Sequence, residues 1–186
     1  MKSIESLFKI YREAGDADYI GESVSQLEHM QQAAFLAKRA GGDDAMVLGA
    51  FFHDIGHLVA PDDAPQMDGL GVVDHERLGA ELLRECGLGG KVADLVELHV
   101  QAKRYLCQAR PAYAAKLSPA SKGTLAFQGG PMTPDEARDF EAHPLFAEIL
   151  RLRAWDEAAK VPDGQGLSVE ELADMARNHK RGQSDA

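Results

Sequence analysis

Six side chains that can bind a metal ion are spread along most of the chain, and they constrain its fold more than any other feature. They are four histidines and two aspartates: His29, His53, Asp54, His75, His99 and Asp156. A structural zinc ion is satisfied by four ligands, normally including cysteines, so six nitrogen and oxygen ligands favour two metal ions. Imidazole and carboxylate without thiolate suit borderline-hard metals such as iron or manganese. Asp54, with two oxygens, is a candidate bridge.

The spacing of apolar residues predicts helices nearly throughout the chain and a sustained strand nowhere. Ile4, Leu7, Phe8 and Tyr11 show the i, i+3, i+4, i+7 pattern of a helix that buries one face. Helices are predicted over about 3–13, 26–40, 45–57, 75–86, 91–107 and 144–160, and others begin after residues 118, 133 and 168. The helix at 45–57 is apolar on most sides, which predicts a central position. Only a bundle that folds these helices around one point brings the six ligands together, so the predicted fold class is all-α.

Several of these helices begin with a recognisable capping pattern. Ser25 with Glu28 and Ser168 with Glu171 form capping-box patterns. Asp43 or Asp44 can cap the third helix and Asp74 the fourth, while Ser118–Pro119 and Thr133–Pro134 place proline at the first helical position. Two segments are predicted to be irregular: the loop 61–73, as a wall or lid of the site, and the glycine-rich GTLAFQGGPM.

Composition predicts one soluble domain. With 186 residues the chain is expected to form a single domain over 1–186, with a core over about 3–178 and a frayed tail after His179. The formal charge of -10 without a block of cations argues against nucleic acid as a partner. No apolar stretch approaches the roughly 20 residues of a membrane helix, and the first residues do not form a signal peptide. The chain is therefore expected to be cytoplasmic, with Cys86 and Cys107 reduced.

The order of these ligands and six short segments resemble a known family. His29, His53–Asp54 and Asp156 follow the pattern of the HD-domain superfamily, whose members are mostly metal-dependent phosphohydrolases. His75 and His99 move the resemblance toward the branch of diiron oxygenases that includes myo-inositol oxygenase. More specifically, the chain is similar to small HD-domain phosphonate oxygenases in the segments DYIGESVSQLEH, HDIGHLVAPDDAPQM, HVQAKRYL, AYAAKLS, TLAFQGGPM and LRLRAWDEAAKVP. Generic HD phosphohydrolases would share HDIGH but not DYIGE or LAFQGGPM.

This resemblance implies an HD-domain helical bundle around a dinuclear iron site, with the two irons in a mixed-valent Fe(II)/Fe(III) state and O₂ as cosubstrate. His29, His53, Asp54 and Asp156 would bind one iron, and His75 and His99 the other, with Asp54 bridging. Tyr19 and Glu22 would form a gate over the metals, in which the Tyr19 phenolate occupies an iron position until substrate displaces it.

A phosphonate also needs cations and hydrogen-bond donors. Lys103 lies four residues after His99 and Arg153 three residues before Asp156, so each cation shares a helix face with a ligand. A guanidinium suits an oxyanion with two accessible oxygens. The resemblance adds further candidates to this set: His57, Ser121, Thr124 and Gln128. In the irregular segment, exposed backbone N–H groups would complete the anion site.

The implied reaction is O₂-dependent cleavage of the C–P bond of a 1-hydroxyphosphonate to inorganic phosphate and a carboxylic acid. The 2-amino compound would give glycine and its N-trimethyl analogue glycine betaine, and a substrate without an amine stays open; a separate hydroxylase would act first. Glu22 or the acids of the loop could neutralise an ammonium, and Tyr19, Tyr105 and Trp155 could face a quaternary amine. The alternatives are an HD-type phosphohydrolase, an inositol oxygenase, and a metal-binding or signalling module without catalysis.

Overall fold

The computed structural model describes residues 2–15, 19 and 22–184, and every regular element in this part of the chain is an α-helix. The helices are α1 (Ile4–Ala14), α2 (Gln26–Arg39), α3 (Asp44–Phe52), α4 (Gly56–Val59), α5 (His75–Glu85), α6 (Lys91–Ala109), α7 (Pro111–Lys116), α8 (Pro119–Phe127), α9 (Pro134–Glu141), α10 (Phe146–Ala158) and α11 (Val169–Ser184). The predicted all-α fold is confirmed. Within the described residues, no helix is long and apolar enough to cross a membrane.

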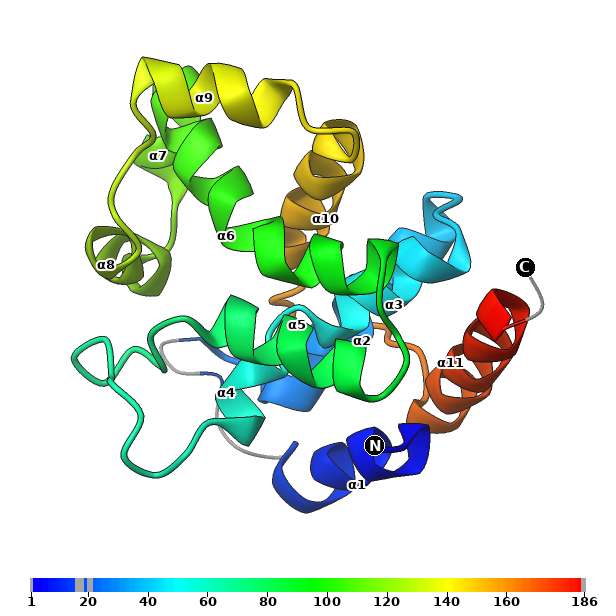
Figure 1. Ribbon diagram of the computed structural model, residues 1–186. Coiled ribbons are helices and arrows are strands. Elements are labelled where there is room, and N and C mark those ends of the chain that lie inside the picture. Colours follow the sequence, from blue (N-terminus) through cyan, green and yellow to red (C-terminus); the bar gives the residue numbers. More distant parts are fainter. Residues whose placement is uncertain (1, 16–18, 20–21, 185–186) are drawn as a thin grey trace.

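Helix α3 is central, because all of its residues from Ala45 to Phe52 are buried. Helices α2, α6 and α10 pack against it (Figure 1). One cluster of buried apolar side chains extends from Ile4 in α1 to Ala176 in α11. The burial of this apolar surface holds together the helices that carry the polar site.

Most of the predicted helix starts are found in the structure. The hydroxyl of Ser25 accepts a hydrogen bond from the Glu28 N–H at 3.2 Å, while the Glu28 carboxylate accepts one from the Ser25 N–H at 2.7 Å. Asp43 caps α3 by accepting from the Met46 N–H. Ser118, Thr133 and Ser168 cap their helices in the same way. Asp74 was predicted to cap α5 but makes no side-chain hydrogen bond there, because its backbone is in the left-handed region with φ 59°.

The predicted helix over 45–57 is interrupted, which changes the setting of two ligands. Helix α3 ends at Phe52, and α4 begins only at Gly56, so Asp54 lies in the turn between them. In this turn the Ile55 N–H donates to the Phe52 carbonyl and the His57 N–H to the Asp54 carbonyl. A Cβ at Gly56 would lie 1.8 Å from the His75 carbonyl oxygen. Glycine therefore permits the close approach of this turn to the start of α5.

The segment GTLAFQGGPM was predicted to be irregular, and for its first half this is wrong. Residues 123–127 form the end of α8, which Ser118 caps and Pro119 opens. Gln128 follows as the C-terminal cap, and Gly129 and Gly130 stop the helix with φ values of 92° and 72°. A Cβ at Gly123 would lie 2.4 Å from Leu70, so α8 rests directly on the 61–73 loop.

Helix α11 continues to Ser184, past the residue after which a frayed tail was predicted. Its buried residues Leu172, Ala173 and Ala176 belong to the apolar cluster, and Figure 1 shows α11 beside α1. Beyond His179, the Lys180 ammonium donates a hydrogen bond to the Cys86 carbonyl at 2.7 Å. Fraying of the tail stays a prediction.

Candidate metal centre and adjoining pocket

The first pair of predicted ligands comes from α2 and the end of α3. The Nε2 atoms of His29 and His53 lie 3.0 Å apart, and both side chains are fully buried. Their Nδ1 atoms each lie 2.8 Å from a backbone carbonyl, that of Ala159 for His29 and that of Ala50 for His53. A carbonyl accepts the proton of Nδ1, so the lone pair of Nε2 is directed at the space between the two rings.

The second pair, from α5 and α6, repeats this arrangement. The Nε2 atoms of His75 and His99 lie 3.3 Å apart. The Nδ1 atom of His99 is 2.7 Å from the Val96 carbonyl, and that of His75 is 3.3 Å from the Val72 carbonyl. A second set of nitrogen lone pairs is therefore directed at one point.

Asp54 lies between the two pairs and turns one carboxylate oxygen toward each. Its Oδ2 is 3.3 Å from His53 Nε2 and 3.8 Å from His29 Nε2, while Oδ1 is 3.3 Å from His75 Nε2 and 3.5 Å from His99 Nε2. Asp156 Oδ1 adds a further oxygen to the first pair, 3.5 Å from His29 Nε2. Five of the six predicted ligands thus form two groups that could each hold a metal ion and that share Asp54, and the sixth, Asp156, adjoins the first group.

The chemistry of these side chains fits a pair of cations. Burial raises the pKa of Asp54, but the neighbouring His53, His75 and His99 outweigh it and hold that pKa well below its usual range. The pKa of Asp156 is likewise held low against burial, chiefly by Arg153. Two buried carboxylates beside four imidazoles are costly unless they are paired or bound to metal. Nitrogen and oxygen ligands with no thiolate suit iron or manganese better than a closed structural zinc site.

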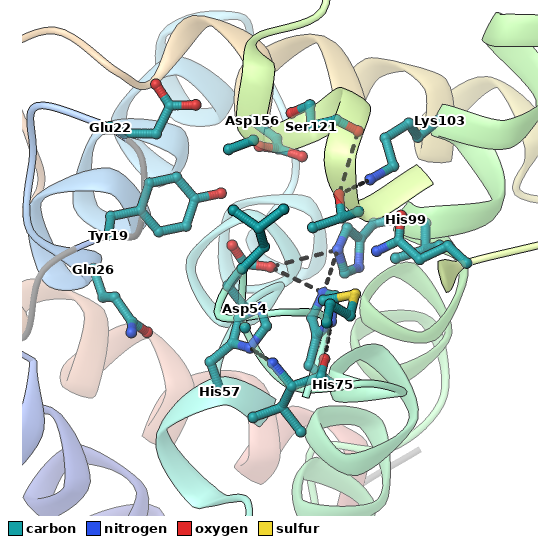
Figure 2. A pocket seen from close by; sticks show the side chains of 18 of the residues that line it. Tyr19, Glu22, Gln26, Asp54, His57, His75, His99, Lys103, Ser121 and Asp156 are labelled. Atoms are coloured by element: carbon teal, nitrogen blue, oxygen red, sulfur yellow. Dashed lines mark hydrogen bonds and ion pairs between the residues drawn. The ribbon is translucent and has the colours of Figure 1, made fainter. Parts of the chain in front are cut away.

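A cavity of about 270 Å³ adjoins this centre. Figure 2 shows Tyr19, Glu22 and Gln26 on one side of it and Lys103 with Ser121 on the other, with Asp54 and Asp156 between them. The loop predicted as a wall contributes Gln66, Met67, Leu70, Gly71 and Val72 to the lining. A ligand in this cavity would therefore reach from the Lys103 side, across the metal centre, to a side where oxygen acceptors lie beside the Lys160 ammonium.

Lys103 is the cation on the side of the cavity opposite Tyr19, Glu22 and Gln26. It is only 4% exposed, and its ammonium donates a hydrogen bond to the Thr124 hydroxyl at 2.9 Å. Burial, with the charge of Arg153 as the second cause, lowers the pKa of Lys103 to about 7. Ser121, Thr124 and Gln128 also line the cavity. These three residues lie on α8 or at its end, and their side chains face the cavity. The backbone N–H groups of this segment were predicted to be exposed, but they are largely hydrogen-bonded within α8.

Arg153 lines the cavity, but its guanidinium is already engaged. It donates to the Tyr113 hydroxyl at 2.9 Å and also to the carboxylates of Asp156 and Glu157. Asp156 therefore presents one oxygen to Arg153 and the other to the histidines. Arg153 orients this ligand, a role that its spacing three residues before Asp156 also suits.

Tyr19 lies against the centre from the acceptor side. Its ring stacks on that of His29 with the centroids 4.2 Å apart, and the ammonium of Lys160 lies 5.8 Å from the Tyr19 ring centre. The Glu22 carboxylate accepts a hydrogen bond from Lys160 at 2.7 Å. Burial, aided by Asp54 and Asp156, raises the pKa of the Tyr19 phenol well above its usual value. Ile20 and Gly21, between these two residues, lie outside the described residues, and a gate formed by Tyr19 and Glu22 stays a prediction.

His57 reaches the cavity beside the second pair. Its Nδ1 accepts the Val72 N–H at 3.1 Å, and its ring stacks on that of His75 at 4.0 Å. Burial and then the charge of His75 lower the pKa of His57 to about 3, so the ring is neutral and carries its proton on Nε2. Gly71, with φ 111°, permits this contact, because a Cβ there would lie 2.7 Å from the His57 ring.

Sequence reasoning missed two polar residues of the cavity lining, Gln26 and Lys160. The signal for Lys160 was its place four residues after Asp156, the same spacing that singled out Lys103. Gln26 is the first residue of α2, one turn before His29, and its Oε1 is buried without a hydrogen-bond partner. Gln128 Oε1 is in the same state. Unpaired acceptors in a cavity indicate a ligand or water that donates hydrogen bonds.

Comparison with known proteins identifies the family to which the chain is similar. A family described as HD domain matches residues 27–139. The chain is 39% identical over 160 residues to [1-hydroxy-2-(trimethylamino)ethyl]phosphonate dioxygenase (glycine-betaine-forming) of Leisingera caerulea, covering 86% of this chain and 81% of the relative. It is 39% identical over 170 residues to hydroxymethylphosphonate dioxygenase of Gimesia maris, covering 91% and 82%. An uncharacterised protein, L432, of Acanthamoeba polyphaga mimivirus is 40% identical over 162 residues, 87% of this chain and 74% of that protein.

Proposed function

Because the chain belongs to the HD-domain family of phosphonate oxygenases, we propose that it cleaves the C–P bond of a 1-hydroxyphosphonate with O₂. One O₂ is consumed: the C–P bond breaks, a new C–O and a new P–O bond form, and the hydrogen on C1 leaves as a proton. The products are a carboxylate and inorganic phosphate, and no external reductant is needed. The hydroxyl on C1 must be installed beforehand, so a separate hydroxylase would supply the substrate.

The observation that carries this proposal is that Lys103 lines the same cavity as Asp54, whose two carboxylate oxygens each face one histidine pair. A buried ammonium within the cavity is suited to a phosphonate, and the two metal positions lie directly beside it (Figure 2). A charge-assisted hydrogen bond is stronger than a neutral one and fixes the phosphorus end of the substrate. The C1 hydroxyl would then point at the metal centre, where cleavage occurs.

We propose that the two groups that share Asp54 would hold a mixed-valent pair of irons, which their nitrogen and oxygen ligands suit. Bound there, iron would supply Lewis acidity and the electron transfer that O₂ chemistry requires. Lys103 and Thr124 would bind the phosphonate, and the Nε2–H of His57 would donate to one of its oxygens or to the C1 hydroxyl. The walls of the cavity would limit the access of water and hold C1 in one orientation.

The far side of the cavity favours a substrate with a hydrogen-bond donor on C2. Of the aromatic residues considered for a quaternary amine, only Tyr19 lines the cavity, since Tyr105 packs against Phe140 and Phe146, and Trp155 lies in the core. Gln26 Oε1 is an unpaired acceptor, and a trimethylammonium has no proton to give it. We therefore propose the free amine, 2-amino-1-hydroxyethylphosphonate, as substrate, with glycine as product.

This preference can be measured as the ratio of kcat/KM for the free amine to that for its N-trimethyl analogue. We expect a ratio of at least about 10, because a buried acceptor left unpaired costs roughly 1–3 kcal/mol. Gln26→Leu should lower the ratio several-fold, since it removes the acceptor. Gln66→Leu is the matched control: the Gln66 amide donates to the Ala64 carbonyl in the 61–73 loop, and the ratio should hold. A wild-type ratio below 1 would contradict the assignment.

Tyr19→Phe should change the visible absorption of the oxidised iron-loaded protein while the metal content stays within about a fifth of wild type. A phenolate bound to ferric iron absorbs visible light, and the stacked ring of the phenylalanine variant keeps its contact with His29. Tyr113→Phe, which alters a hydroxyl bonded to Arg153 and not facing the histidines, serves as the control. An identical spectrum in the Tyr19 variant would exclude Tyr19 as an iron ligand.

The proposed function is tested by phosphate release from the iron-reconstituted protein with 2-amino-1-hydroxyethylphosphonate, its N-trimethyl analogue and hydroxymethylphosphonate. Each reaction is run in air and under argon. We expect release in air and none under argon. If none of the three releases phosphate while phosphate esters are hydrolysed under argon, the chain is a phosphohydrolase and the proposal is wrong.

A further inference from the structure

His75 differs from the other three ligand histidines in the groups that its Nδ1 atom faces. In His29, His53 and His99 this atom lies 2.7 to 2.8 Å from a backbone carbonyl. In His75 the Val72 carbonyl is more distant, at 3.3 Å, and a carboxylate oxygen, Oε2 of Glu76, lies at 3.4 Å. Among the described residues, this is the one ligand histidine whose Nδ1 is recorded beside a carboxylate.

Glu76 Oε2 is itself buried and has no hydrogen-bond partner, although the side chain as a whole is 16% exposed. A buried carboxylate oxygen without a donor is unfavourable. The N–H of His75 is a donor at nearly hydrogen-bonding distance, and α5 holds the two residues next to each other in its first turn. A small rotation of either side chain would complete this hydrogen bond.

We infer that Glu76 is the positioning residue of the second metal position, where it accepts the Nδ1–H of His75 and strengthens Nε2 as a ligand. A carboxylate partner raises the basicity of a metal-binding imidazole more than a carbonyl does. The second position, formed by His75, His99 and Asp54, is therefore more electron-donating than its two imidazoles alone would make it. This inference rests on the proposed function only in requiring a metal ion there, and it does not depend on iron or on O₂.

The direct test is calorimetric titration of metal-free protein with Co²⁺, read as two separate affinities. Glu76→Gln keeps the shape and an acceptor oxygen but removes the charge. It should weaken one of the two affinities about tenfold, the lower end of the range for the loss of an outer partner. Glu76→Leu removes the acceptor as well and should weaken the same affinity further. Glu81→Gln on the exposed face of α5, where Glu81 pairs with Arg77, should change neither.

Single-position variants identify which affinity has changed. In His29→Ala the second position remains intact, and Glu76→Gln should weaken Co²⁺ binding there. In His99→Ala the first position remains, and Glu76→Gln should have no effect. A Glu76→Gln variant that leaves both affinities unchanged, or lowers both equally in the otherwise unaltered chain, overturns the inference.

A second readout separates electronic tuning from a purely structural role. With iron bound, the negative charge of Glu76 should stabilise the higher oxidation state at the second position, so Glu76→Gln should raise the reduction potential of the pair. An unchanged potential would contradict the electronic part of the inference. Loss of Co²⁺ affinity in a protein that releases no phosphate in air would support the inference and refute the proposed function.

Discussion

Replacing Asp54 with alanine is expected to empty both metal positions and to abolish activity. The reason is geometric: Oδ2 faces the His29–His53 pair and Oδ1 faces the His75–His99 pair, so one side chain serves both. Without it, the first position keeps Asp156 as its one carboxylate and the second keeps only two neutral imidazoles. Metal content by elemental analysis should fall from about two ions per chain to near zero.

The variant Asp54→Asn tests whether the shared carboxylate holds both ions. The asparagine keeps one oxygen but places an NH₂ donor toward one of the two histidine pairs, where it opposes a cation. At most one ion should bind. Asp63→Asn, in the exposed part of the 61–73 loop, is the control and should retain both ions. Two ions in a folded Asp54→Ala protein would show that the carboxylate is not shared.

The second large effect is expected for Lys103→Met, which should raise KM for the phosphonate roughly ten- to a hundredfold while the metal content holds. A hydrogen bond to a charged group contributes about 1.5–3 kcal/mol, and the methionine keeps the length and apolar stem of the lysine. Steady-state kinetics with the free-amine substrate measures the change. Because Lys103 is nearly fully buried, a loss of this size is not masked by solvent.

Lys91→Met is a suitable control for the lysine experiment. Lys91 opens the same helix α6 but pairs with Asp43 and Glu148, away from the cavity. Its kinetics should match the unaltered chain. A Lys103→Met protein with unchanged KM would place the phosphonate elsewhere in the cavity.

Arg153 was grouped with Lys103 in the sequence because both cations share a face with a ligand, but the structure separates their roles. The Arg153 guanidinium binds Asp156 and Glu157, its i+3 and i+4 neighbours, and the more distant Tyr113. Among the described residues, the hydrogen-bond partner of the Lys103 ammonium is by contrast a neutral group, the Thr124 hydroxyl. Spacing alone therefore identifies cations near the centre but not which of them is already neutralised.

Local sequence patterns also predict the fold only in part. Helical periodicity and capping residues located most of the helices, and with them His29, His75, His99 and Asp156, whereas His53 and Asp54 follow the end of α3. The break in the helix after Phe52 was not predicted. At this break Gly56 approaches the carbonyl of His75, which is distant in the sequence, so no local pattern indicates it. Similarly, the glycines of GTLAFQGGPM suggested an irregular segment, whereas Ser118 and Pro119 start a helix that continues to Phe127. Local patterns predict helix starts well, because capping residues set them. They predict helix ends less well where contacts with distant residues decide them.

The most direct test of the central claim is the reaction of the iron-loaded protein with 2-amino-1-hydroxyethylphosphonate under ¹⁸O₂. We predict that one O₂ is consumed for each phosphate released and that the carboxylate of the glycine formed carries one ¹⁸O atom, because C1 gains a single oxygen from O₂. Phosphate release without O₂ consumption, or with glycine that carries no label, would contradict oxidative cleavage of the C–P bond.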